Sequence, residues 1–323
     1  MAGLKKPRVR GEKKYDSTAY LYLLPAFVLL AVFTVYPVVN TVVTSLKLDY
    51  RFLTGDFVRF SAQHYADILN DATFRRACVN TAFLAFICVP LSMLISLIAA
   101  LLLNSVKKLR GFFTTLFYLP QVTNVIAAGM VFAFLFNTNF GLVNMVLGWF
   151  GVDPVAWISG VGIAKSAALY NQAYARCLFI LMVYSLWSGL SLKVILFLGG
   201  LQNINPQYYQ AARLDGTSRW NIFRKITFPL LSPTTMYVFI TSVITAFKAY
   251  SAVVALFGNS YGPIGDQSKM MITIVGYIID ALGDYLSPGA ISIASAAAVI
   301  LLLIIMALTA LQLKLSKKWV HYK

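Results

Sequence analysis

Residue types that carry out enzyme chemistry are scarce in this sequence of 323 residues. Its three cysteines form no Cys-x-x-Cys motif and only two histidines are present, so a metal site of the common Cys/His kinds lacks ligands. The stretch Trp-Ser-Gly-Leu-Ser at 187–191 offers serines of the kind that an intramembrane protease uses as a nucleophile. Such a serine needs a base, and neither His64 nor His321 falls near this stretch, so we expect neither a catalytic nor a metal site.

The composition indicates a lipid environment for the elements that position these residues. The chain is 59% hydrophobic and 12% charged, with a mean hydropathy of +0.74, whereas soluble domains are about 45–50% apolar and about 25% charged. A folded protein with about half the usual fraction of charged residues has too few charged side chains to cover its surface in water. We therefore expect the chain to fold in a bilayer.

Six segments are long and apolar enough to cross that bilayer as helices, since about 20 apolar residues make one span. They lie at 19–45, 80–104, 112–137, 177–201, 230–257 and 286–311. The first is too long for a secretory signal and no cleavage motif closes it, so we interpret it as a retained helix. A further apolar stretch at 141–157 is short and interrupted, and we expect it to lie along the outer membrane surface. The sequence thus predicts an all-α integral membrane protein with six transmembrane helices.

Lysine and arginine residues are distributed unequally between the connections. With the N-terminus placed in the cytoplasm, the inner segments hold seventeen of them against three acids, and the outer segments hold eight basic and eight acidic residues. This asymmetry is the positive-inside pattern, so we predict that both termini are cytoplasmic. It also accounts for the net charge of +16 without nucleic acid as a partner.

The fourth connection, at 203–229, contains start and stop signals for two short helices. Asn205 followed by proline favours a helix start, and Gly216 favours its end. Ser218 is suited to cap a second helix, which we expect Pro229 to end before the fifth span. Two such helices would form a compact knob that fits a cleft in a partner protein, and an ordinary connecting loop is the alternative.

Motifs in the same connection have a regular spacing: Gln-Ala-Ala at 210–212, Asp-Gly at 215–216 and Ile-Thr-Phe-Pro at 226–229. This pattern resembles the EAA loop of ABC importer permeases, which is Glu-Ala-Ala, a glycine four residues after the second alanine, and then Ile-x-Leu-Pro. Further stretches at 117–121, 141–144, 196–204 and 229–233 resemble sugar-type permeases of the maltose and glycerol-phosphate uptake systems.

This resemblance implies the MetI-like transmembrane domain of type I ABC importers, with one additional N-terminal helix. In that family the loop is a coupling helix that sits in a cleft of a cytoplasmic ATPase and switches the pathway between inward- and outward-facing states. The residues that match the loop are Tyr209, Gln210, Ala211, Ala212, Asp215, Gly216, Ile226 and Pro229. Gln210 replaces the family's glutamate and Phe228 its leucine, which implies a changed contact with less charge assistance.

The implied assembly needs several other chains. A second homologous permease would complete a heterodimer, two ABC ATPase subunits would bind ATP and Mg²⁺, and an extracytoplasmic solute-binding protein would dock outside. The chain itself has no GxxxxGK[ST] phosphate loop, so we expect it to bind no cofactor. The resemblance implies a bacterial-type cell (inner) membrane, in contact with lipid. The chain would then divide into a basic tail at 1–18, a first helix and outer loop at 19–78, a permease core at 79–315 and a tail at 316–323.

The resemblance also locates the solute pathway at mid-membrane, between the fourth and fifth spans. Aromatic and hydroxyl side chains there suit sugar rings, although the same types line helix interfaces in membranes generally. Lys193 and Lys248 are the only charges well inside the spans; each is suited either to snorkel to the interface or to bind an anionic sugar. The candidate pathway residues are Tyr184, Trp187, Ser188, Ser242, Thr245 and Lys248.

An ion-coupled secondary transporter or a channel is the alternative function. Such carriers commonly place carboxylates within the membrane, and no predicted span here contains Asp or Glu at depth. Asp280 and Asp284 fall in an outer connection, and no internal repeat is evident. The sequence therefore favours the importer.

Overall fold

The computed structural model describes residues 17–106, 108, 110–158, 166–263 and 268–319. Most of the predicted tail at 1–18, and the end of that at 316–323, lie outside these residues. The elements of the first half are α1 (Ser17–Leu30), η1 (Ala31–Val35), α2 (Tyr36–Ser45), β1 (Lys47–Leu48), β2 (Arg59–Phe60), α3 (Gln63–Asn70), α4 (Ala72–Phe83), η2 (Leu84–Cys88), α5 (Val89–Ser105), α6 (Arg110–Val122), α7 (Val125–Leu135) and α8 (Leu142–Trp149). Those of the second half are α9 (Ala167–Gln202), α10 (Pro206–Leu214), α11 (Arg219–Ile222), η4 (Phe223–Thr227), α12 (Phe228–Phe247), α13 (Ser251–Phe257), η5 (Gly258–Ser260), α14 (Ile274–Gly283) and α15 (Ala290–Trp319).

Long apolar helices dominate the described residues, which confirms the all-α prediction. Five of these helices are long and apolar enough to cross a membrane, and α6 with α7 makes a sixth when the pair is taken as one span. The five are Tyr20–Ser45, Ala72–Ser105, Ala167–Gln202, Arg219–Phe247 and Ala290–Lys317. The strands that the structure describes, β1 and β2, form a single two-residue antiparallel pair.

The third predicted span is not a straight helix. Its two halves, α6 and α7, meet at an angle of 97°. The break falls at Asn124, whose side chain caps α7 by accepting hydrogen bonds from the backbone N–H groups of Ile126 and Ala127 at 2.9 and 3.1 Å. An extended residue with a capping side chain starts a new helix there. The prediction of one continuous helix over 112–137 is therefore wrong.

The fifth predicted span, at 230–257, is also corrected. The helix begins at Arg219 and runs through Pro229 to Phe247, so Pro229 does not end a separate short helix. After Phe247 the chain turns, and α13 forms a separate helix that crosses α7 at Gly129. A Cβ on Gly129 would lie 2.2 Å from that of Ala255, so only glycine permits this crossing.

Three prolines are accommodated inside long helices by short π-helical segments. The segments η1, η2 and η4 each end two residues before a proline: Pro37, Pro90 and Pro229. A proline cannot donate to the carbonyl four residues earlier and its ring clashes with that group. The wider turn moves this carbonyl away, so the helices continue past the prolines.

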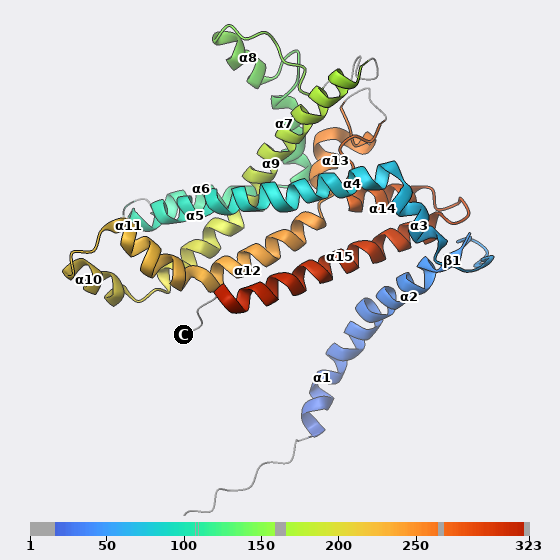
Figure 1. Ribbon diagram of the computed structural model, residues 1–323, viewed down its shortest axis with the longest axis horizontal. Coiled ribbons are helices and arrows are strands. Elements are labelled where there is room, and N and C mark those ends of the chain that lie inside the picture. Colours follow the sequence, from blue (N-terminus) through green and yellow to red (C-terminus); the bar gives the residue numbers. More distant parts are fainter. Residues whose placement is uncertain (1–16, 107, 109, 159–165, 264–267, 320–323) are drawn as a thin grey trace, which may run out of the picture.

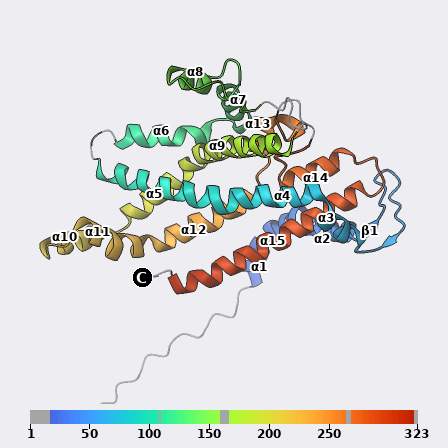
Figure 2. The same ribbon diagram turned by 45° about the horizontal axis from the view of Figure 1, so that its top comes forward.

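Several of the described helix ends and short elements lie at two opposite ends of the molecule. Figures 1 and 2 both show α10, α11, the C-terminal end of α5, the start of α6 and the C-terminal end of α15 at one end. The β1–β2 pair, α3 and α14 lie at the other. The first end carries the basic connections of the predicted inner side. In Figure 1, α1 projects away from the body, and no part of the apolar window of Tyr20–Ser45 is buried.

A non-helical segment that contains a turn is buried among the helices at the end opposite α10. Met270, Met271 and Ile272 are completely buried. Asn80 of α4 donates to the carbonyls of Met270 and Ile272 at 3.1 and 2.7 Å and accepts from the hydroxyl of Tyr174 of α9 at 2.7 Å. These bonds satisfy backbone groups that have no water to bond with. They fasten α4, α9 and the segment before α14 together.

Candidate functional site

The predicted short helix in the fourth connection is confirmed as α10. Asn205 caps it by accepting from the backbone N–H of Gln207 at 2.9 Å, and a proline occupies its first turn. Gly216 ends it with a φ of +67°, which favours glycine. Ser218 caps α11, accepting from the N–H of Asn221 at 3.4 Å. Local capping signals therefore account for the shape of this connection.

The residues of the predicted coupling motif differ in exposure. Gln210, Ala211, Asp215 and Gly216 are exposed, Ala212 is buried, and Tyr209, Ile226 and Pro229 are half-buried. The Tyr209 hydroxyl lies 3.2 Å from that of Thr227 in η4, which ties α10 to the start of the long helix. The exposed set forms a surface at the outer edge of α10.

Two exposed apolar residues on this surface were not singled out from the sequence. Leu214 is 89% exposed and Trp220 is 67% exposed. Leu214 follows Gln210 by four residues and so shares its face of α10. The sequence could have indicated Leu214, because a large apolar residue four positions after Gln210 falls on the helix face that carries the motif. Such residues, exposed in the isolated chain, are typical of an interaction surface.

Four of the six predicted pathway residues line one cavity of about 350 Å³, formed by η2, α5, α9, α12 and the start of α13. These four are Ser188, Ser242, Thr245 and Lys248. Further hydroxyl groups line it, together with Lys193, which was singled out for its charge. The Lys193 ammonium donates to the hydroxyl of Ser92 at 2.5 Å.

The other two predicted pathway residues, Tyr184 and Trp187, lie outside the cavity lining. Tyr184 is 1% exposed, and its hydroxyl donates to the carbonyl of Val125 at 2.8 Å. Both rings pack against Phe132, with centroids 5.2 and 5.3 Å away. In this structure they join α9 to α7.

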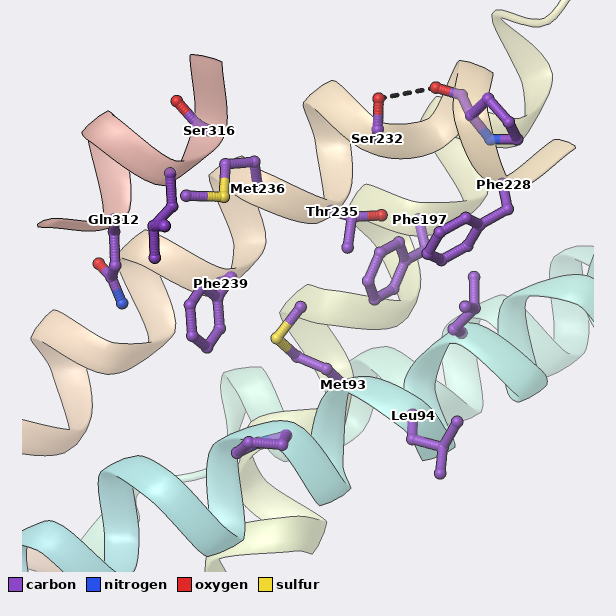
Figure 3. Close-up of a pocket in the computed structure, with 14 residues that line it drawn as sticks. Met93, Leu94, Phe197, Phe228, Ser232, Thr235, Met236, Phe239, Gln312 and Ser316 are labelled. Atoms are coloured by element: carbon purple, nitrogen blue, oxygen red, sulfur yellow. Dashed lines mark hydrogen bonds between the residues drawn. The ribbon is translucent and has the colours of Figure 1, made fainter. Parts of the chain in front are cut away.

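A larger cavity of about 970 Å³ lies among α5, α9, α12 and α15 and is almost entirely apolar. Figure 3 shows Phe197 and Phe228 side by side at one end of it, and Met236 with Gln312 toward the other. The hydroxyl of Ser232, which also faces it, donates to the carbonyl of Pro229 at 2.7 Å. Of these two cavities, the smaller one therefore holds most of the polar side chains that could bind a solute.

Comparison with known proteins identifies the class of this protein. Residues 92–321 match the family described as "Binding-protein-dependent transport system inner membrane component". The chain belongs to this family, whose MetI-like fold it shares. It is therefore a multi-pass inner-membrane permease protein.

Named relatives and solved structures agree with this assignment. The arabinooligosaccharides transport system permease protein AraP of Halalkalibacterium halodurans is 31% identical over 299 residues, which cover 92% of this chain and 87% of that protein. The lactose transport system permease protein LacF of Rhizobium radiobacter is 28% identical over 271 residues, covering 81% and 84%. A chain in the crystal structure of a bacterial alginate ABC transporter, in complex with an alginate pentasaccharide-bound periplasmic protein, matches with a TM-score of 0.77. It is 20% identical, and the match covers 94% of this chain and 95% of that one.

Proposed function

We propose that this chain is the permease subunit of an ATP-driven importer and forms half of the pathway for a sugar, an oligosaccharide or a sugar derivative. The observation that carries the proposal is the capped helix α10, with an exposed surface at one end of the molecule, joined to a helix that lines a polar cavity. Relatives named for lactose and arabinooligosaccharide transport support a carbohydrate solute.

The link from α10 to the cavity is mechanical. Tyr209 bonds to Thr227, from which one continuous helix runs to Phe247. At 1.5 Å per residue, Ser242 lies about 20 Å along this helix from Thr227. A displacement of α10 by an ATPase would therefore move the cavity wall that carries Ser242 and Thr245. We infer that Gln210 and Leu214 contact that ATPase, with Gln210 bonding through its amide.

The ATPase belongs to other chains in this proposal. Two ABC ATPase subunits bind ATP and Mg²⁺ and perform the hydrolysis, because this chain has no GxxxxGK[ST] loop. The basic connections at the α10 end face the cytoplasm, as do both termini. This chain is then a non-catalytic subunit.

A second permease subunit and a solute-binding protein complete the assembly. The helix formed by α1, η1 and α2 carries an apolar window with no buried residues. In a bilayer such a helix is covered by lipid or by another transmembrane chain. We propose that it packs partly against the second permease, and that an extracytoplasmic solute-binding protein docks at the end that carries β1 and β2.

Affinity purification tests this proposal directly. A tagged chain is solubilised gently from its native membrane, and mass spectrometry identifies its partners: an ABC ATPase, a second EAA-loop permease and a solute-binding protein are expected. Leu214→Asp should abolish recovery of the ATPase, because it places a charge in the proposed apolar contact. Leu53→Asp is the matched control, since Leu53 is 77% exposed at the opposite end. A homogeneous preparation of this chain that moves solute without ATP would instead establish a secondary transporter or channel.

A further inference from the structure

The described residues that line the cavity beside α12 include two lysines and no aspartate or glutamate. Lys193 and Lys248 both line it, among hydroxyl groups and small side chains. Among the described residues the recorded ion pair is between Lys269 and Asp280, and neither cavity lysine takes part in one. Lysines inside a membrane protein normally pair with a carboxylate or reach the interface, because an unpaired buried charge is costly. A cavity with two of them has an unusual excess of positive charge.

Lys193 points into the cavity and not toward the nearer end of its helix. It stands nine residues before the end of α9, a distance of about 14 Å. Its ammonium lies 3.0 Å from the place that a Cβ on Gly189 would occupy, one turn back along the helix. It also bonds to Ser92 of α5. This side chain therefore does not snorkel toward the α10 end, and glycine at 189 leaves the room that it occupies.

Lys248 approaches the same cavity from the end of α12. It is the C-cap residue that directly follows that helix, where the helix dipole favours a cation, so its position has a partly structural cause. Within the described residues, however, its ammonium makes no recorded hydrogen bond or ion pair. It is exposed and free to bind a solute that enters the cavity.

We propose that this cavity binds the anionic group of an acidic saccharide, carboxylated or phosphorylated, between Lys193 and Lys248, with the hydroxyl groups of Ser188 and Ser242 available to the sugar ring. This inference rests on the proposed function for the presence of a saccharide. The charge preference rests on the cavity itself. A volume of about 350 Å³ admits one or two sugar units. An anionic solute compensates both ammonium groups, whereas a neutral sugar leaves them unpaired.

Charged thiol reagents measure the potential in the cavity without knowledge of the solute. The chain, with its native cysteines replaced by alanine, receives Thr245→Cys, because Thr245 is exposed on the cavity wall. Within its native complex it reacts with sulfonatoethyl (anionic) or trimethylammonioethyl (cationic) methanethiosulfonate. Both reagents react with the same thiolate, so the anionic-to-cationic ratio of their rates does not depend on the fraction of thiol that is ionised. Dividing this ratio by the one measured with 2-mercaptoethanol removes the intrinsic difference between the two reagents. We expect this normalised ratio to exceed 10.

Substitutions assign the potential to the two lysines. Lys193→Met with Lys248→Met should lower the normalised ratio at least fivefold, and Lys193→Arg should preserve it. Lys314→Met is the matched control, because it removes one positive charge from an exposed position on α15 outside the cavity. A normalised ratio near or below 1 in the otherwise unsubstituted complex would overturn the proposal; carboxylates supplied by a partner chain would give this result.

Protection of the same cysteine tests the class of ligand. Glucuronate, glucose 6-phosphate and glucose are added separately at millimolar concentration, and the neutral reagent methyl methanethiosulfonate reports the rate. At least one acidic sugar should slow the reaction threefold more than glucose, and the double lysine variant should lose this difference. Equal protection by glucose, or no protection by either acid, would overturn the proposal. Failure of the importer assignment is seen separately, when no ATPase copurifies.

Discussion

Replacement of Asn80 by alanine should strongly destabilise the end of the molecule opposite α10. The side chain is completely buried and makes three hydrogen bonds: two to backbone carbonyls at 3.1 and 2.7 Å and one from the Tyr174 hydroxyl at 2.7 Å. The substitution removes the partner of two carbonyls on buried residues and of the hydroxyl of the half-buried Tyr174. Each unsatisfied group costs about 1–3 kcal/mol, and partial relaxation reduces the sum, so we expect a loss of about 4 kcal/mol.

The assay uses the protein's own cysteines. Cys88 and Cys177 are buried, whereas Cys78 is half-buried. In a Cys78→Ala background, a coumarin maleimide therefore gains fluorescence when heating exposes the two buried thiols. At about 2 °C per kcal/mol for a large chain, the unfolding temperature of Asn80→Ala should fall by about 8 °C. Asn171→Ala is the matched control, because Asn171 is exposed on α9, and it should shift the temperature by less than about 1 °C.

A double-mutant cycle tests the physical reasoning. Tyr174→Phe removes the third hydrogen bond and leaves the Asn80 carbonyl oxygen unpaired, so alone it should cost about 1–2 kcal/mol. In the Asn80→Ala background that partner is already absent, and the same change should cost less than about 0.5 kcal/mol. Equal costs in both backgrounds, or a loss below about 1 kcal/mol for Asn80→Ala, would refute the argument.

Three further substitutions have distinct expected outcomes. Gly200→Ala should abolish the accumulation of folded protein, because the new Cβ would lie 2.7 Å from the Thr234 hydroxyl. Fluorescence-detected size exclusion measures this accumulation. Gly199→Ala is the control and should leave the amount of folded protein unchanged, because its Cβ would have nothing within 4 Å. Asn144→Ala removes four hydrogen bonds that close the outer loop, so proteolysis of that loop should accelerate about tenfold or more, and an unchanged rate would contradict this. Tyr209→Phe should lower solute-stimulated ATP hydrolysis severalfold with an unfolding temperature within about 2 °C of the original; an unchanged stimulation would remove this contact from the coupling path.

The parts of the structure that the sequence predicted are those with local signals. Asn205, Gly216 and Ser218 mark helix starts and ends by their own backbone and side-chain chemistry, and α10 and α11 follow them. The bend between α6 and α7 also had such signals, in Pro120, Gln121, Thr123 and Asn124, but they lie within a stretch at 112–137 that is predominantly apolar. Hydropathy alone therefore joined the two helices into one.

Other features were not predictable because their causes are distant in the sequence. Asn80 and Met270 are 190 residues apart, and only the fold brings the buried segment to that amide. The early starts of α4 and α9 were missed for a different reason. Their first turns extend beyond the apolar windows, and charged residues such as Arg75 and Arg176 made them resemble loops. Tyr184 and Trp187 were predicted to lie in the pathway because aromatic side chains bind sugar rings. In the structure both rings instead pack against Phe132.

The two ends of the molecule are held by different kinds of interaction, and this bears on how it moves. At the end away from α10, side-chain amides and hydroxyls bond to backbone groups, as Asn80 does and as Thr81 does with the N–H of Ile274 at 3.1 Å. Toward the α10 end, α5, α12 and α15 instead meet around an apolar cavity (Figure 3). Apolar contacts are non-directional and tolerate sliding, whereas hydrogen bonds to buried backbone fix a geometry. The chain just after α12 is held in this way, because the carbonyl of Ala249 accepts from the Thr273 hydroxyl at 2.7 Å. A pull on α10 is therefore expected to tilt α12 about Ala249, which changes the position of Ser242 and Thr245 in the cavity wall.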